Sequence, residues 1–387
     1  MLGHFLNTIF RVGGQRQRVT EAELLSQALN SVLSLIRFKK LKIYFGCDDM
    51  FNDLRRIINN AVSLKFASWG LIFVALNSVS VGLSAQGYPS KPITLIAPYT
   101  AGGDSDFSGR NLASVATKLM NQPLIVQNIV GASGTIGSLK VRNSTPDGYT
   151  LLISRVGSQA IVPALDSKTP YKWNDFTFIS LLDLNPMVCV VKSDSPYKNM
   201  RDLLGALRSD PGKLNYATAG PGTSQHLSVE ILLNAANLPS SAAAMIPYKS
   251  AGESSAALLG NQVDFVCNTM TTLAGQIKGG SMRGLMVSTP DRLKDFPDIP
   301  SSRELGLNQF EQATGWSGLF GPPGLPQDVV DKWVEVLKKV AQDPAWENAN
   351  KTAGAIAAIR SPAETDQFVK QQVLLYERLG TNLGLRK

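Results

Sequence analysis

The sequence predicts an α/β fold made of two domains with a ligand cleft between them. Apolar runs of strand type alternate with stretches of helical spacing along roughly the last 300 residues, which is typical of layered α/β domains with mainly parallel sheets. A single hydrophobic core does not usually hold this many strands and helices, so two domains are expected. Glycine-rich loops stand directly before four predicted helices. In an open α/β sheet such loops meet at the carboxyl ends of the strands, where a cleft forms.

Eight strands and four long helices carry this prediction. The strands, in chain order, are ITLIAPY (93–99), LIVQNIV (124–130), YTLLIS (149–154), MVCVVK (187–192), KLNYATA (213–219), AAAMIPY (242–248), QVDFVCN (262–268) and MRGLMVS (282–288). Helices are expected over 106–120, 224–237, 253–259 and 329–341. One domain is expected to cover 88–187 together with 315–387, and the other 188–314. The chain is expected to cross between them near 185–188 and 314–317.

The formal net charge of +8 lies mainly at the N-terminus. Residues 1–87 hold ten basic and five acidic residues, which leaves the remaining chain at +3. A body this close to neutrality has no basic stripe that would follow a phosphate backbone. Nucleic acid is therefore not expected as a partner.

A secretory signal peptide is predicted over residues 50–87. Its three parts are the basic residues Arg55, Arg56 and Lys65, the apolar core 66–76 and the small-residue exit 83–87. The alternative is a membrane anchor, but the apolar run of about 11 residues is shorter than the roughly 20 that a spanning helix needs. Residues 1–49 precede a second candidate start, Met50, and are expected to be an over-extended N-terminus. The mature protein is therefore expected in the periplasm.

Four loops are expected to place helix N-termini around the cleft. They are 98–103, 131–134, 220–223 and 250–252. Each helix N-terminus offers unpaired N–H groups and partial positive charge, which suits an anion such as a carboxylate. The alternative for any single loop is a turn with an N-cap, and Asp106 is the expected N-cap of the first helix. Asp104 and Asp106 are expected to complement the dipole of that helix.

No set of catalytic or metal-binding residues is found in the predicted exported part of the chain, residues 88–387, which we call the exported body. Its one histidine, His226, lies two residues from Ser224, and residues two apart on a helix do not face each other. Neither a nucleotide-binding glycine pattern nor a serine-hydrolase elbow occurs. The histidine and two separated cysteines, Cys189 and Cys267, are too few for a zinc site, and the cysteines are expected to be buried free thiols. We therefore predict no catalytic residue, no metal and no cofactor.

Several stretches of the exported body together resemble one family. They are "YPSKPITLIAPYTAGGDSD", "GASGTIGS", "PDGYTLL", "PGKLNYATAGPGTSQHL", "PYKSAGESSAALLGNQVDF" and "DIPSSRELGL". In order and spacing they resemble the Bug family of periplasmic solute-binding proteins, which belong to tripartite tricarboxylate transporters. The resemblance covers residues 88–384. It implies a type II periplasmic-binding-protein fold whose two α/β domains close on a small carboxylate.

The resemblance also implies where the ligand binds. In that family two loops hold the ligand carboxylate, here 100–106 and 132–135, and a loop of the second domain, here 218–224, adds small polar groups. The candidate ligand-binding residues are Tyr99, Ala101, Gly102, Ser105, Asp106, Ser133, Gly134, Thr135, Arg155, Ser158, Thr218, Gly220, Thr223, Ser224 and Asn268. The Gly102 and Gly134 backbones are expected to approach the ligand closely.

The sequence departs from the family pattern at three positions near the expected pocket. Asn268 stands where an acidic residue is frequent, which disfavours a ligand whose ammonium needs an acidic partner. Arg155 replaces a small polar residue, and Gln159 replaces a histidine. Arg155 directly follows a core strand, and its planar guanidinium suits a second anionic group, which favours a dicarboxylate. The alternative is a surface arginine that is solvated or paired with a nearby acid.

The sequence therefore predicts a non-catalytic receptor that captures a small carboxylate, dicarboxylates and aromatic acids included. We expect it to act as a monomer and to deliver the ligand to the membrane subunits of a tripartite tricarboxylate transporter or to a sensor kinase. Hydrogen bonds would hold the ligand, and a hinge would close the cleft. Two alternatives stay open at this point. One is an exported enzyme that reuses the binding-protein fold, and the other is an interaction protein with an empty cleft.

Overall fold

The computed structural model describes residues 11–12, 15–16, 87–248 and 250–386. The chain forms two compact units, residues 1–84 and 85–387. In the first unit the described strands β1 (Arg11–Val12) and β2 (Gln15–Arg16) pair antiparallel. The predicted signal peptide lies outside the described residues except for Gly87, so it stays a prediction.

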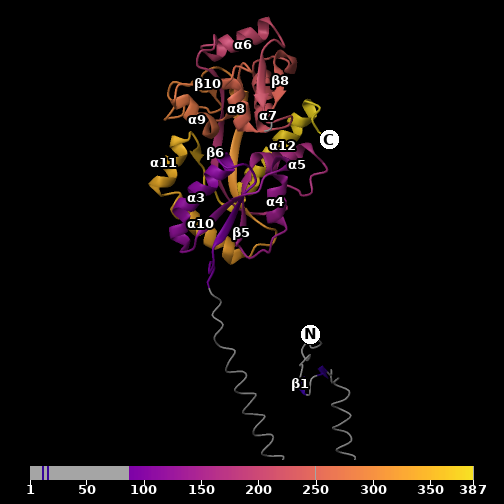
Figure 1. Cartoon of the computed structure of the whole chain (residues 1–387), viewed down its shortest axis with the longest axis vertical. Coiled ribbons are helices and arrows are strands. Elements are labelled where there is room, and N and C mark those ends of the chain that lie inside the picture. The colour runs from indigo at the N-terminus through magenta and orange to yellow at the C-terminus, as the bar shows by residue number, and fades with distance from the viewer. Residues whose placement is uncertain (1–10, 13–14, 17–86, 249, 387) are drawn as a thin grey trace, which may run out of the picture. The chain divides into compact units, whose positions relative to one another are not determined.

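The second unit is an α/β structure built on one large mixed sheet (Figure 1). Its strand order is β10-β6-β11-β5-β3-β4, and β9 and β12 also pair with β6. The strands are β3 (Ile93–Ala97), β4 (Leu124–Asn128), β5 (Thr150–Arg155), β6 (Thr177–Lys192), β9 (Val266–Thr269), β10 (Met282–Val287), β11 (Thr314–Gly321) and β12 (Ile356–Ala357). β3 pairs parallel with β4 and β5, whereas β6 pairs antiparallel with its partners. β7 (Asn215–Thr218) and β8 (Ala244–Pro247) form a separate parallel pair.

The 16-residue strand β6 joins the two parts of the large sheet. From Thr177 to Pro186 it pairs with β11, and from Met187 onward it pairs with β9 and β10. Pro186 has no N–H for a ladder hydrogen bond, and it lies where the pairing changes from β11 to β9. Most of β6 is buried, as expected of a strand that reads as a nearly continuous apolar run.

Helices cover the sheet, and half of the described α-helices begin with a side-chain N-cap. The α-helices are α3 (Asp104–Met120), α4 (Thr135–Arg142), α5 (Val162–Leu165), α6 (Met200–Ser209), α7 (Ser224–Ala235), α8 (Ala251–Leu259), α9 (Met270–Lys278), α10 (Gln327–Val340), α11 (Pro344–Thr352) and α12 (Pro362–Asn382). Short 3-10 turns are η1 (Ala132–Gly134), η3 (Ser240–Ala242) and η4 (Asn308–Gln312), and η2 (Gly157–Ile161) is a π-helical turn. Helices α10 and α11 pack against α3, whereas α12 packs against α5 (Figure 1). α6 and α12 each start with a capping box, which satisfies two backbone donors at once.

The buried apolar side chains form four clusters that divide along the chain. Two clusters draw almost entirely on residues before 183 and after 315, and they contain the fully buried Trp316, Trp333 and Trp346. The other two draw on residues 187–313. Burying one such large side chain stabilises the fold by about 1.5–3 kcal/mol. The clusters divide near the predicted domain boundaries, and the independence of the two domains stays a prediction.

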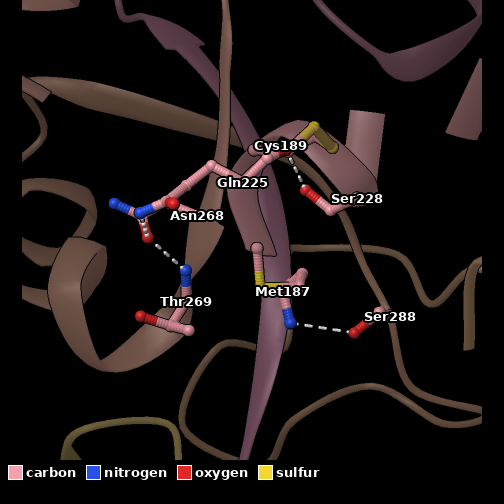
Figure 2. The surroundings of a disulfide bond; sticks show 8 residues. Met187, Cys189, Gln225, Ser228, Asn268, Thr269 and Ser288 are labelled. Atoms are coloured by element: carbon pink, nitrogen blue, oxygen red, sulfur yellow. Dashed lines mark hydrogen bonds between the residues drawn. A yellow bond between two sulfur atoms is a disulfide. The ribbon is translucent and has the colours of Figure 1, made fainter. Parts of the chain in front are cut away.

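Cys189 and Cys267 form a disulfide, so the prediction of buried free thiols is wrong. The two residues are in register on the antiparallel strands β6 and β9, with their Cα atoms 4.0 Å apart. Figure 2 shows the bond beside Ser228 of α7, with Asn268 following on β9. The cysteines lie 78 residues apart in sequence. Strand register brings them together, and sequence spacing does not reveal that register.

Helix α3 begins at Asp104, and its N-cap is Gly103 rather than the predicted Asp106. Asp106 is the third residue of the helix. Its carboxylate accepts a hydrogen bond from the Gly102 N–H at 3.0 Å and forms an ion pair with Arg110 at 2.9 Å. From inside the first turn, this carboxylate accepts a hydrogen bond from a backbone N–H of the preceding loop. It therefore does not act as an N-cap, which would accept from an N–H of the helix itself.

Candidate functional site

A cavity of about 320 Å³ lies where the four predicted loops meet. Its lining residues are Tyr99, Thr100, Gly103, Asp104, Ser105, Val130, Gly131, Ala132, Ser133, Gly134, Arg155, Val156, Gly157, Ile161, Val162, Ala219, Gly222, Thr223, Ser224, Gln225, Ser250, Ala251 and Thr272. Residues 99–162 form one wall, and residues 219–272 form the other. The cavity therefore lies between segments that belong to the two predicted domains.

Four helices begin at the wall of this cavity. The N-caps Gly103 of α3, Thr223 of α7 and Ser250 of α8 all line it, and so does η1, which leads into α4. The first amides of a helix have no partner within the helix, and the aligned peptide dipoles give that end partial positive charge. Four such ends around one cavity suit an anionic group.

The hydroxyl of Ser105 also favours a ligand group that accepts hydrogen bonds. Ser105 lies in the first turn of α3 and lines the cavity. Its side chain is 0% exposed, and its Oγ has no hydrogen-bond partner among the described residues. Buried hydroxyls nearly always have a partner, and leaving one without a partner costs about 1–3 kcal/mol. The Oγ has almost no accessible surface in this structure, so a ligand atom in the cavity would satisfy it once the serine side chain turns toward the cavity.

The two loops of the first wall are fixed to each other. The Tyr99 hydroxyl donates to the Ser133 carbonyl at 2.8 Å, and the Asn128 amide donates to the Tyr99 carbonyl at 3.0 Å. Burial raises the pKa of Tyr99, so the hydroxyl stays protonated and keeps donating. Gly134 has a φ of +87°, and a Cβ there would lie 2.9 Å from Tyr99 Cζ. Glycine at 134 thus lets the second loop pack directly on the tyrosine.

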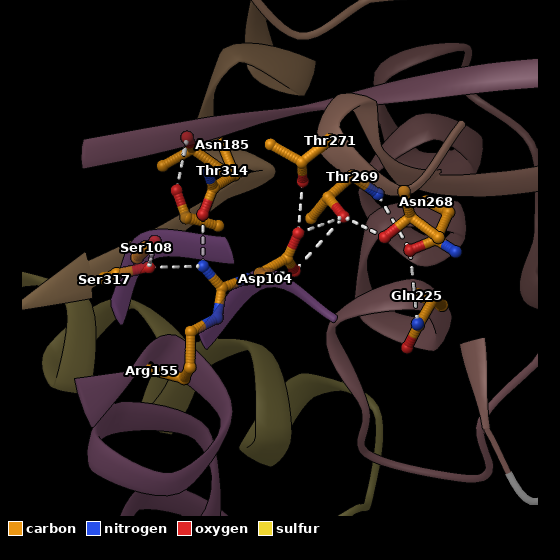
Figure 3. A network of polar contacts seen from close by, with 12 residues as sticks. Asp104, Ser108, Arg155, Asn185, Gln225, Asn268, Thr269, Thr271, Thr314 and Ser317 are labelled. Carbon is orange, nitrogen blue, oxygen red and sulfur yellow. Dashed lines mark hydrogen bonds and ion pairs between the residues drawn. The ribbon is translucent and has the colours of Figure 1, made fainter. Parts of the chain in front are cut away.

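Arg155 forms an ion pair with Asp104 in the cavity wall (Figure 3). Arg155 ends β5, as predicted, but it is only 5% exposed, so the surface alternative is wrong in that respect. Its Nη2 lies 2.5 Å from Asp104 Oδ2, and its Nη1 donates to Ser317 Oγ at 3.0 Å and to Asn185 Oδ1. The nearby acid that the alternative invoked is therefore present.

Asp104 also contacts residues of the other predicted domain. The Thr269 hydroxyl donates to both carboxylate oxygens, at 3.0 and 3.2 Å, and the Thr271 hydroxyl donates to Oδ1 (Figure 3). Thr269 ends β9 and Thr271 belongs to α9, whereas Asp104 starts α3. This carboxylate thus links residues of the two predicted domains.

A second carboxylate, Asp183, lies buried behind the ion pair. It is 0% exposed, and neither of its oxygens has a hydrogen-bond partner among the described residues. The strand register places Ser317 of β11 opposite both Asp183 and Arg155. Burial raises the pKa of Asp183 to about 6, and the nearby Ser108 hydroxyl and Arg155 charge oppose that shift only partly.

Seven of the fifteen predicted ligand-binding residues line the cavity. They are Tyr99, Ser105, Ser133, Gly134, Arg155, Thr223 and Ser224. The other eight are not part of the lining: Ala101, Gly102, Asp106, Thr135, Ser158, Thr218, Gly220 and Asn268. Three of these eight are buried: Ser158, Thr218 and Asn268. The side-chain oxygen Oδ1 of Asn268 accepts a hydrogen bond from the side-chain amide of Gln225 at 3.3 Å. Gly102 has a φ of +78° but open space around its Cβ position, so backbone conformation explains the glycine there.

Sequence reasoning missed several lining residues, Asp104 and Thr272 among them. Asp104 was assigned to the helix dipole, which gave no signal that a buried arginine would bind it. Thr272 lies in the first turn of α9, a helix that the sequence analysis did not predict. The apolar part of the lining, from Val130, Ile161 and Val162, belongs to no motif. Only the position of the surrounding helices reveals it.

His226 has structural partners within its own loop and helix. It is buried, its Nδ1 accepts from the Gly222 N–H at 3.1 Å, and its Nε2 lies 3.6 Å from Glu230 Oε1. Among the described residues, no group of three or more His, Cys, Asp or Glu side chains is placed to hold a metal ion. In the same part of the chain, no helix has the length and apolar character needed to cross a membrane.

The α/β fold and a cavity at four helix N-termini are those of a solute-binding protein. Residues 109–385 match the tripartite tricarboxylate transporter family receptor, TctC. The chain belongs to this family of periplasmic binding proteins, which includes the Bug proteins.

Relatives and solved structures agree with this assignment. The chain is 30% identical to protein BugT of Bordetella pertussis over 305 residues, which is 78% of this chain and 92% of BugT. The structure of the periplasmic binding protein BugD aligns with a TM-score of 0.69 at 31% identity, covering 78% of this chain and 100% of BugD. MatC of Rhodopseudomonas palustris with bound malate aligns with a TM-score of 0.68 at 26% identity, covering 76% and 99%.

Proposed function

We propose that this chain is exported and captures a small carboxylate in the cavity at the four helix N-termini. The observation that carries the proposal is the buried hydroxyl of Ser105 in the first turn of α3, a cavity-lining residue whose Oγ has no hydrogen-bond partner in the part of the chain that the structure describes. A ligand carboxylate would accept from this hydroxyl and from the free amides of the same turn. The malate bound to MatC supports a carboxylate as the ligand class.

The captured acid would be passed to the membrane subunits of a tripartite tricarboxylate transporter or to a sensor kinase. Family membership supports the first receiver. The Cys189–Cys267 disulfide supports export, because such bonds persist in oxidising compartments such as the periplasm and are rare in the cytosol. We further propose that the two predicted domains close on the ligand around β6 and β11, the strands that run between them.

A thermal-shift screen of the purified exported body against a panel of small carboxylates tests this function. A ligand at about 100 times its Kd adds roughly 2.7 kcal/mol of stability, which is a clear shift in Tm. Mass spectrometry of the released ligand then separates the alternatives. Recovery of the unchanged acid supports a receptor. Conversion of the acid would support an exported enzyme, and a panel without any shift would contradict ligand capture.

A further inference from the structure

The cavity lining holds two charged side chains, Arg155 and Asp104, and they are bound to each other. The formal charge of the lining is therefore zero. One carboxylate of a ligand is matched by the helix N-termini and by Ser105, as proposed above. The structure offers no further uncompensated cation in this lining for a second carboxylate.

We propose that Asp104 cancels the charge of Arg155 and thereby makes the cavity select acids with one carboxylate over dicarboxylates. Asp104 is thus a specificity-determining residue of the site. This inference rests on the proposed function, because it concerns which carboxylate the same cavity holds. It differs from the role that the sequence suggested for Arg155, which was to bind a second anionic group.

Both terminal nitrogens of the Arg155 guanidinium already donate hydrogen bonds within the protein. Nη1 donates to Ser317 and Asn185, and Nη2 donates to Asp104. A second ligand carboxylate would have to displace Asp104 or lie against it. Two carboxylates that share one buried site repel each other strongly enough to prevent both from being ionised.

Asp104 is itself held in place by two threonines of the other predicted domain. Its Oδ1 accepts from Thr269 and Thr271, and its Oδ2 accepts from Arg155 and Thr269. Displacing it would leave these donors without an acceptor, which is costly for buried groups. The same four contacts occupy the lone pairs that a ligand ammonium would need, so Asp104 does not select for amino acids.

Two further observations favour a ligand whose part beyond the bound carboxylate is uncharged. Strand register places Asp183 and Arg155 on either side of Ser317, so the electrostatic field of a second buried carboxylate reaches the guanidinium. The apolar side chains Val130, Ile161 and Val162 line part of the cavity, and apolar lining of this kind holds the apolar part of a ligand.

A calorimetric comparison of four proteins tests the proposal with adipate and its monoamide, and with succinate and its monoamide, at pH 7.5. Each pair differs only in the charge of the second group. The wild type and the double variant Asp104→Asn/Arg155→Gln have a neutral lining, Asp104→Asn has a lining of +1, and Arg155→Gln has a lining of −1. The double variant is the matched control, because it keeps polar side chains at both positions and restores a neutral lining. Circular dichroism and Tm report whether each variant is folded.

In the wild type, neither diacid should bind more tightly than its monoamide. Asp104→Asn should raise the preference for at least one diacid by about 10-fold or more, which corresponds to one charge-assisted hydrogen bond, and the double variant should return it to the wild-type ratio. Arg155→Gln should weaken the binding of both diacids, relative to their monoamides, below the wild-type ratio. A wild-type preference of 10-fold or more for a diacid would overturn the proposal, as would an unchanged ratio in folded Asp104→Asn. If Asp104→Asn does not fold, the wild-type ratio decides. Absence of binding by all four acids to the wild type would instead contradict the proposed function.

Discussion

Replacing the buried carboxylate of Asp183 with an amide should stabilise the protein above pH 6. The pKa of Asp183 is raised from 3.8 to about 6 in the folded protein, mainly because burial disfavours its charged form. One pKa unit corresponds to about 1.4 kcal/mol, so the shift of about two units amounts to roughly 3 kcal/mol. Because the folded state binds this proton more tightly than the unfolded state, the contribution is fully present below pH 3.8 and is lost as pH rises to 6.

The Asp183→Asn variant lacks this titration. The difference in the free energy of unfolding between variant and wild type should therefore be constant below about pH 4, grow in favour of the variant from pH 4 to 6, and level off at roughly 3 kcal/mol above that. Any fixed cost of the new amide is present at all pH values, so the change with pH isolates the carboxylate. Titrations of all other groups largely cancel in the difference.

Urea unfolding followed by tryptophan fluorescence at pH 4, 5, 6, 7 and 8 measures this difference. Trp316, Trp333 and Trp346 are fully buried and report on unfolding. The control is Asp194→Asn, which removes a carboxylate whose side chain is 68% exposed and so separates the loss of a buried carboxylate from the loss of an exposed one. A flat difference for Asp183→Asn, or one that favours the wild type as pH rises, would refute the reasoning.

Three further changes should have measurable effects. Replacing Cys189 and Cys267 with alanine opens a loop of 78 residues and should lower the free energy of unfolding by about 4.5 kcal/mol on a chain-entropy argument; equal urea midpoints for the oxidised wild type and the variant would count against the disulfide. Gly134→Ala places a methyl group 2.9 Å from Tyr99 Cζ at a φ of +87°, and it should cost roughly 1–3 kcal/mol in unfolding experiments; an unchanged stability would show that the loop is not held against the ring. Ser105→Ala should weaken carboxylate binding by about 10-fold in calorimetry and leave stability unchanged or improved, whereas unchanged affinity would remove this hydroxyl from the site.

Local sequence patterns predicted much of the fold because most of its elements carry their own signal. All eight predicted apolar runs contain strands. β11 (TGWSGLFG) was not predicted as a strand, since three glycines and a serine interrupt its apolar pattern and only its place between β5 and β6 makes it one. Helix α12 carries a clear N-terminal signal, Ser361 with Glu364 three residues later, which the sequence analysis did not use.

The sequence predicted which loops line the candidate site. It did not predict which side chains pair with each other there. Each of the four glycine-rich loops contributes to one cavity, because the carboxyl ends of the strands and the helix starts set their position. The pairing of Asp104 with Arg155 depends on how α3 packs beside β5, and the disulfide depends on the register of β6 and β9. Neither is a property of spacing along the chain.

The central claim is that the cavity holds the carboxylate of a small acid at its helix N-termini. Calorimetric titration with the acid that gives the largest thermal shift, and with the primary amide of the same acid, tests it most directly. The amide keeps the shape and removes the charge that the helix ends are expected to recognise. The acid should bind and be recovered unchanged, and the amide should bind at least about 10-fold more weakly. Equal affinity for the acid and its amide would contradict the account.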